Sequence, residues 1–196
     1  IEGYIFNGWY EGSVKVTGIS VGTTGDKVFT AKFTPLTYSI TCYDDGTAIN
    51  SFSYTIESSV ELEPLPDGDY EFDSWIDANG NKRTTVEQGS TGDIYLTALW
   101  KGTEENPYLI YNVADLENIS NRPYCSYKLM RDISLSTWTP IGTASNPFTG
   151  TFDGNNHKIT FNMLNNAGGY NSFGLFAYTG SNSLIKNLTI DGNIGN

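Results

Sequence analysis

One segment of this chain occurs in two similar copies, and this internal repeat limits the possible architecture more than any other feature. Residues 4–33 read YIFNGWYEGSVKVTGISVGTTGDKVFTAKF, and residues 70–100 read YEFDSWIDANGNKRTTVEQGSTGDIYLTALW. A repeat of this length usually encodes one supersecondary unit that packs against its neighbours. With one gap of a single residue, the two copies align at Tyr4/Tyr70, Phe6/Phe72, Trp9/Trp75, Gly25/Gly92, Asp26/Asp93, Thr30/Thr97, Ala31/Ala98 and Phe33/Trp100.

The residue pattern inside each copy predicts β-strands. An aromatic alternation, Tyr-x-Phe-x-x-Trp, indicates one half-buried strand, and a second alternating strand follows a Thr-Gly-Asp turn. Between the copies, residues 38–43 alternate as a strand, residues 44–46 (Asp-Asp-Gly) form a turn, and the return strand is expected to begin at Phe52. Residues 35–101 are therefore predicted to hold a complete β module. Residues 1–34 are predicted to hold only the C-terminal half of the preceding one.

The character of the chain changes after Trp100. A polar boundary with Gly102 and Pro107 precedes a predicted strand over residues 108–111. Asn112 is then expected to cap a short helix within residues 112–121, with Val113, Leu116 and Ile119 on one face. Strand-length apolar alternations follow at residues 127–130, 133–135, 148–163 and 173–194, separated by Asp-Gly, Gly-Asn and Gly-Gly turns. The spacing of 26 residues between Ile159 and Ile185 (185 − 159) is compatible with successive coils of a solenoid.

These phrases resemble two bacterial surface modules. The run Gly3-Tyr4-Ile5-Phe6-Asn7-Gly8-Trp9-Tyr10, followed by the Thr-Gly-Asp strand, resembles the Listeria–Bacteroides repeat, also called the internalin-type B repeat. The second copy departs from that pattern at Asp69 and Ser74. The phrases GTEENPYLIYNVADLENIS, FTGTFDGNNHKI and FGLFAYTGSNSLIKNLTIDG resemble the opening of a right-handed β-helix with the GLUG motif.

The resemblance implies a mainly β fold in three segments. A half module (1–34) and a complete module (35–101) would be β-grasp-like, and residues 102–196 would form the capped first coils of a β-helix. In such a solenoid each coil is stabilised by its neighbours, so the last coil is expected to expose apolar residues such as Leu188 and Ile190 and to continue into further coils. The chain is accordingly expected to be a piece of a longer repeat protein.

Charge and composition exclude several classes of partner. The chain has 22 acidic and 11 basic side chains, for a formal charge of −11, and no local cluster of Lys or Arg. Nucleic acid and anionic membrane surfaces are therefore not expected partners. No apolar stretch approaches the length of a membrane-spanning helix. Cys42 and Cys125 fall in different modules and are expected to be unpaired buried thiols.

Residues that could carry chemistry are few. His157 is the only histidine and lies in an Asp-Gly-Asn-Asn-His turn, where a structural role is expected. A glycosidase needs only two facing carboxylates, but the acidic residues mostly stand beside Gly or Asn in predicted turns, where Asp binds its own backbone. The candidate carboxylates are Asp44, Asp45, Asp67, Asp69, Asp73, Asp77, Asp132 and Asp153. No catalytic residue is predicted, and no binding residue can be assigned.

Two further candidates have structural alternatives. Residues 77–81 (Asp-Ala-Asn-Gly-Asn) offer oxygen ligands for calcium, but the glycine comes too early for an EF-hand loop, and a hairpin turn is expected instead. Trp9, Trp75, Trp100 and Trp138 could form a sugar-stacking platform, although their repeat-equivalent or strand-end positions favour the core. No metal site and no cofactor are predicted.

The leading functional hypothesis is a non-catalytic repeat segment of an exported bacterial cell-surface protein, acting as an adhesin or stalk. One alternative is a carbohydrate-binding or carbohydrate-cleaving β-helix. Another is an accessory region of a large secreted peptidase. An extracellular protein or a glycan is a possible ligand, and further repeats of the same chain are expected neighbours.

Overall fold

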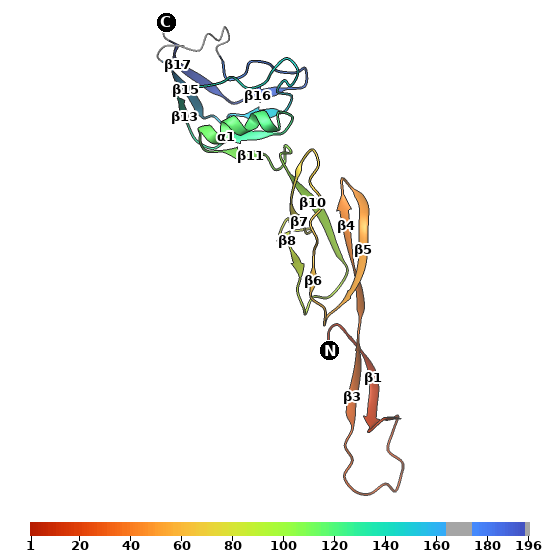
Figure 1. The fold of residues 1–196 in the computed structure, drawn as a ribbon. Coiled ribbons are helices and arrows are strands. Elements are labelled where there is room, and N and C mark those ends of the chain that lie inside the picture. Colours follow the sequence, from red (N-terminus) through yellow and green to blue (C-terminus); the bar gives the residue numbers. More distant parts are fainter. Residues whose placement is uncertain (164–173, 195–196) are drawn as a thin grey trace. The chain divides into compact units, whose positions relative to one another are not determined.

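In the computed structural model almost all regular structure is β-strand (Figure 1). The structure describes residues 1–163 and 174–194. The chain divides into two compact units: residues 1–65 with 73–99, and residues 66–72 with 100–196. The mainly β class is confirmed. The segment bounds 1–34, 35–101 and 102–196 stay a prediction.

The first sheet of unit 1 is a three-stranded antiparallel ribbon in the order β2-β1-β3. Its strands are β1 (Tyr4–Glu11), β2 (Val14–Val16) and β3 (Thr30–Pro35). The β1–β3 register shifts between Phe6 and Gly8, and Gly8 has a positive φ of 128°. This irregularity is a β-bulge, for which glycine is suited because it lacks a Cβ.

The second sheet of unit 1 is mixed, in the order β5-β4-β10-β7-β8. Strands β4 and β10 are parallel and are joined in register at Ile40↔Ile94 and Cys42↔Leu96, whereas β4 and β5 form an antiparallel hairpin. Ile40 and Leu96 are fully buried. The bounds are β4 (Thr37–Asp44), β5 (Thr47–Thr55), β7 (Glu71–Ile76), β8 (Lys82–Arg83) and β10 (Ile94–Lys101), and a small antiparallel pair adds β6 (Val60–Glu61) and β9 (Thr85–Val86).

The return strand β5 begins at Thr47, not at Phe52 as predicted. Asp45 and Gly46 both have positive φ, at 44° and 74°, and form a tight turn that reverses the chain directly into pairing with β4. Two consecutive residues of positive φ match the twist of an antiparallel hairpin. The first part of β5 therefore pairs with β4 at Thr47, Ala48 and Asn50. These residues lack the aromatic alternation by which the strand was recognised in the sequence.

The two sequence copies form the same pair of strands, as predicted, β1 with β3 in the first copy and β7 with β10 in the second. In the first copy Phe6 and Phe33 are in contact, with ring centroids 5.3 Å apart, and the aligned Phe72 and Trp100 are 5.6 Å apart. The hairpins also match, because Trp9 pairs with Val16 in one copy and Trp75 with Arg83 in the other.

The prediction that both tryptophans are buried is wrong for Trp9. Trp75 is 4% exposed, whereas Trp9 is 52% exposed. The indole Nε1 of Trp75 donates to the Glu63 carbonyl oxygen at 2.9 Å, so residues preceding the second copy cover this side chain. A repeated sequence does not ensure repeated burial, because burial depends on the segment packed against it.

Unit 2 contains two sheets in which all the assigned strand pairs are parallel. The first has the order β11-β12-β14-β16 and the second the order β13-β15-β17. In-register positions stack apolar side chains, such as Ile133 on Ile159 and Leu135 on Phe161, and these four residues belong to one buried core. The bounds are β11 (Tyr108–Ile110), β12 (Tyr127–Leu129), β13 (Ile133–Leu135), β14 (Thr151–Asp153), β15 (Lys158–Met163), β16 (Leu184–Lys186) and β17 (Thr189–Ile194).

The in-register stacking of unit 2 does not follow the 26-residue spacing between Ile159 and Ile185. Ile159 is in register with Ile133 on one side and Ile190 on the other, and Ile185 is in register with Phe152 in the other sheet. The 26-residue spacing between Ile159 and Ile185 therefore joins residues of two different sheets. The number of residues from one coil to the next varies, because turns of different length connect the strands. One fixed period in the sequence therefore does not identify the stacked residues.

The predicted short helix is present. Helix α1 (Val113–Glu117) continues as the 3-10 helix η1 (Asn118–Asn121). Asn112 and Asp115 form a capping box, in which each side chain accepts from the backbone of the other residue. Leu116 and Ile119 are fully buried, and Val113 packs against the same core. Helix α1 contacts β11 and β13, the first strands of the two parallel sheets.

The last described strands expose part of the apolar surface that was expected. Ile190 is 51% exposed, whereas Leu188 is half-buried against the core. The predicted Gly-Gly turn at residues 168–169 and residue 173 of the last predicted segment lie outside the described residues. Among residues 1–163 and 174–194, no helix has the length and apolar character needed to span a membrane.

Candidate functional site

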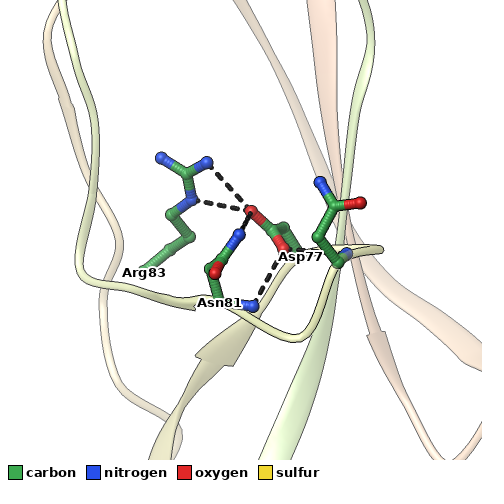
Figure 2. Close-up of polar contacts among 4 residues, drawn as sticks. Asp77, Asn81 and Arg83 are labelled. Atoms are coloured by element: carbon green, nitrogen blue, oxygen red, sulfur yellow. Dashed lines mark hydrogen bonds and ion pairs between the residues drawn. The ribbon is translucent and has the colours of Figure 1, made fainter.

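The turn at Asp77 was considered above as a possible calcium loop. In the structure it is a hairpin turn, and protein donors bind the Asp77 carboxylate (Figure 2). Asp77 Oδ1 accepts from the backbone N–H groups of Asn79 at 2.9 Å and Asn81 at 3.0 Å. Asp77 Oδ2 accepts from Arg83 Nε at 3.0 Å and Nη2 at 2.9 Å. The backbone hydrogen bond from Asn81, followed by Arg83 and the other donors, lowers the pKa of Asp77 to about 2 against the effect of burial.

This arrangement opposes cation binding. Figure 2 shows the guanidinium of Arg83 beside Asp77 Oδ2, where its positive charge would repel a calcium ion. A calcium site also requires six or more oxygen ligands. Within the described residues, no group of three or more His, Cys, Asp or Glu side chains is placed to hold a metal.

Asp132 and His157, which lie 25 residues apart in the sequence, meet in unit 2. Asp132 Oδ1 accepts from the Lys158 backbone N–H at 2.9 Å and lies 3.1 Å from His157 Nδ1. The Lys158 hydrogen bond, then the His157 contact, lowers the pKa of Asp132. Because Lys158 is the first residue of β15, this carboxylate joins the start of one coil to the preceding coil. An acid–imidazole pair also occurs in catalytic triads, but there the imidazole contacts a nucleophilic hydroxyl or thiol.

Asp153 joins neighbouring turns in the same way. Its Oδ1 accepts from the Asn155 backbone N–H at 2.8 Å and from Asn187 Nδ2 at 3.0 Å. Burial acts to raise the pKa of Asp153, but these hydrogen bonds outweigh it and the pKa is lowered. Asn155, Asn156 and Asn187 have φ of 50°, 61° and 54°, the left-handed region that asparagine tolerates better than most residues.

The close stacking of these turns depends on Gly154. A Cβ atom at this position would lie 2.5 Å from the Asn187 carbonyl oxygen. The Asn156 N–H donates to that same oxygen at 2.8 Å, and the Gly154 N–H donates to the Lys186 carbonyl at 2.8 Å. The turn after β14 is thus bonded to the turn after β16. Asp153 and His157 are placed by this packing.

Two of the remaining acidic candidates bind neighbouring protein groups. Asp67 accepts from the Phe72 backbone N–H at 2.8 Å, and Asp73 is bonded to Lys82 and Ser74. The Asp69 carbonyl oxygen, not its carboxylate, receives Arg122 Nη1 at 3.5 Å. Asp45 is in the exposed β4–β5 turn described above.

The other two tryptophans, Trp100 and Trp138, are half-buried. Trp138 packs on the core of unit 2, and its Nε1 donates to the Leu175 carbonyl oxygen at 3.1 Å. Trp100 lies edge-on to Phe72. The core interpretation is thus confirmed for Trp75 and in part for these two, whereas Trp9 is about half exposed.

A small cavity beside α1 was not predicted from the sequence. It has a volume of about 280 Å³ and is lined by residues that include Glu71, Tyr108, Asn118 and Arg122. Tyr108 donates to Glu71 Oε2 at 3.0 Å, and burial followed by this carboxylate raises the pKa of Tyr108 to about 12. Glu71 and Tyr108 are 37 residues apart and belong to no motif, so their contact could not be predicted from the sequence.

Comparisons with known proteins give two relatives. The chain is 39% identical over 102 residues to a Gly-rich membrane protein of Evansella cellulosilytica, an alignment that covers 47% of this chain and 12% of that protein. It is 35% identical over 125 residues to halomucin of Haloquadratum walsbyi, covering 58% of this chain and 1% of halomucin. No family model matches the chain, and no solved structure matches it. The chain is therefore homologous to short segments of two much longer proteins, since it spans about an eighth of the first and a hundredth of the second.

Proposed function

We propose that this chain is a non-catalytic structural segment of an exported cell-surface protein, a stalk that holds other parts of its parent protein away from the cell. In this proposal the segment around β4 to β10 is a β-grasp-like repeat module. Unit 2 is the capped start of a right-handed β-helix. Further repeats of the same protein are its neighbours.

The observation that carries the proposal is the use made of the polar side chains. Asp77, Asp132 and Asp153 all accept backbone hydrogen bonds that fix turns, and their pKa values are all lowered, so they are ionised acceptors near neutral pH. A general acid in a glycosidase needs a raised pKa. The two relatives support the surface location, because one is described as a membrane protein and both are far longer than this chain.

An alternative is a carbohydrate-binding segment, and the cavity beside α1 is the feature that favours it. Tyr108 stacks on Tyr127 with ring centroids 5.6 Å apart, and Arg122 and Glu71 supply charged groups at the same cavity. Aromatic faces with a few polar groups are common in sugar sites. A role as an accessory region of a secreted peptidase would be equally non-catalytic.

Calorimetric titration with a panel of soluble polysaccharides separates the stalk from the carbohydrate-binding alternative. The stalk proposal expects no saturable heat. Saturable binding that Arg122→Ala removes, with the far-UV circular dichroism unchanged, would favour the glycan site. Arg131→Ala is the matched control, because Arg131 is exposed and does not line this cavity.

A further inference from the structure

The two copies of the repeat differ in which of their apolar side chains are covered. Three aligned pairs, Trp9/Trp75, Ile19/Val86 and Phe29/Leu96, are apolar in both copies. In the second copy these side chains are 4%, 4% and 0% exposed. In the first copy Trp9 is 52% and Ile19 is 62% exposed, and Phe29 is half-buried. The first copy thus keeps a core-type sequence whose side chains are less buried in the described structure than those of the second copy.

The strands show the same difference. In the second copy β10 begins at Ile94, and residues 94–97 pair in parallel with residues 40–43 of β4. The aligned residues of the first copy are 27–30, yet β3 begins only at Thr30. Residues 27–29, which are missing from β3, align with residues 94–96, which pair with β4 in the second copy. Likewise Val86 pairs with Val60 in β9 and β6, whereas the aligned Ile19 is in no strand.

Residues 37–65, termed here the front half, supply this cover in the second copy. They contribute β4 along the edge of β10, β6 beside Val86, and the Glu63 carbonyl oxygen for Trp75 Nε1. They also anchor the turn before β10, because the Ser39 backbone N–H and hydroxyl donate to Asp93 Oδ1 at 2.8 and 2.9 Å. The first copy retains the aligned acceptor, Asp26, which is exposed.

We propose that residues 4–33 form an acceptor surface for the front half of an equivalent repeat: a β-hairpin and following strand with the residue pattern of residues 37–65. Its first strand pairs in parallel with residues 27–30, and its later backbone covers Trp9. The occupant is a separate front-half segment and not a second folded copy of this chain. In a folded copy β4 is already paired on both edges, with β5 and β10.

One position departs from the second copy. Lys27 replaces Ile94, and its ammonium bonds to Glu11 Oε1 at 2.9 Å. The aligned Ile94 is the first residue of the β4–β10 pairing and is half-buried. A lysine at such a position can lay its alkyl stem along the strand and keep its charge in water. The inference is independent of the proposed function, because a half repeat would need this cover in a stalk, an adhesin or an enzyme.

The test grafts a second copy of residues 37–68 ahead of Gly3 in the full chain and measures amide hydrogen exchange by mass spectrometry. The offset follows the alignment, in which Gly3 corresponds to Asp69. The amides of residues 27–30 and the peptide containing Ile19 should exchange at least about tenfold more slowly than in the ungrafted chain, as expected when an open edge joins a cooperative unit. The matched control is the same graft carrying Ile40→Asp in the grafted copy only, which should restore the fast exchange.

Unchanged exchange in the grafted chain, or equal slowing by the Ile40→Asp graft, would overturn the proposal. If the grafted chain does not fold, a free peptide of residues 37–68 is titrated into the unmodified chain, and saturable protection of residues 27–30 supports the proposal while none overturns it. Sedimentation of the unmodified chain is the last arm. Dimers that protect residues 27–30 would make a second copy the occupant, which also contradicts the proposal.

Discussion

Three of the candidate catalytic and metal-binding side chains of this protein accept backbone hydrogen bonds in turns or at a strand start. Asp77 receives two backbone N–H groups and the Arg83 guanidinium, and its pKa falls from 3.8 to about 2. A carboxyl whose pKa is lower in the folded than in the unfolded protein stabilises the fold above its ordinary pKa and loses this contribution as the pH falls through the lower value. The Asp77 turn should therefore be acid-sensitive.

Asp77→Asn should lower the melting temperature of unit 1 near neutral pH and should reduce its dependence on acid. The loss that the unmodified chain shows between about pH 4 and about pH 2 should be smaller in the variant, because the asparagine cannot be protonated in this range. Thermal unfolding measured across this range checks the prediction. Asp26→Asn, at an exposed position, is the control, and an acid dependence identical in Asp77→Asn and the unmodified chain would refute this assignment.

The repeat-equivalent tryptophans should differ strongly in their contribution to stability. Trp75→Ala removes a buried ring with a hydrogen bond and should lower the free energy of unfolding by about 3–5 kcal/mol. Trp9→Ala removes a half-exposed ring and should cost about 1 kcal/mol. Pulse alkylation of Cys42, a free thiol buried in unit 1 whose pKa burial raises, reports this unfolding during a denaturant titration. Equal effects of the two substitutions would show that Trp9 is also a core residue.

At the scale of elements, local signals in the sequence predicted local structure well. The capping box of Asn112 and Asp115 and the alternation of β4 are short-range patterns, and both elements form where expected. The positions of the stacked coils were not predictable in the same way. Ile159 stacks on Ile133 and Ile190 because the register is set by the parallel pairing, and turns of unequal length hide that register from any fixed spacing.

In the candidate site, too, local features could be predicted from the sequence and long-range contacts could not. The structural role of the Asp77 and Asp153 turns could be inferred from the neighbouring Gly and Asn residues. The Asp132–His157 contact and the cavity at Tyr108 could not, because each joins residues 25 or more positions apart without a motif. The exposure of Trp9 was not predicted, because the residue pattern of a strand indicates which side chains can be buried. It does not indicate whether another segment covers them.

The stacking of the coils in unit 2 should be sensitive to Gly150. A Cβ atom at this position would lie 1.9 Å from the Cys125 carbonyl oxygen, which is backbone and cannot move aside as a flexible side chain could. Gly150→Ala should therefore lower the melting temperature of unit 2 by more than 10 °C, about the shift expected for several kcal/mol in a domain of this size. Gly68→Ala, also in unit 2 and with open space around the added Cβ, should leave it almost unchanged. Similar melting by both variants would contradict the close packing of these coils.

At the scale of the whole molecule, the chain combines a net negative charge with two units built mainly of short β-strands. Its formal charge of −11 keeps like segments apart and favours solubility. The relatives place homologous segments within far longer proteins. These features support the proposed role as a stalk segment.

The central claim, that the carboxylates of unit 2 are structural, is tested most directly by measuring turnover and stability on the same variants. The unmodified chain, Asp132→Ala and Asp153→Ala are assayed on polysaccharide, ester and peptide substrates, and each is melted under the same buffer conditions. We expect no turnover by any of the three and a lower melting temperature for both variants, since each loses hydrogen bonds between adjacent coils. Turnover by the unmodified chain that either substitution abolishes, without a change in melting temperature, would contradict the claim.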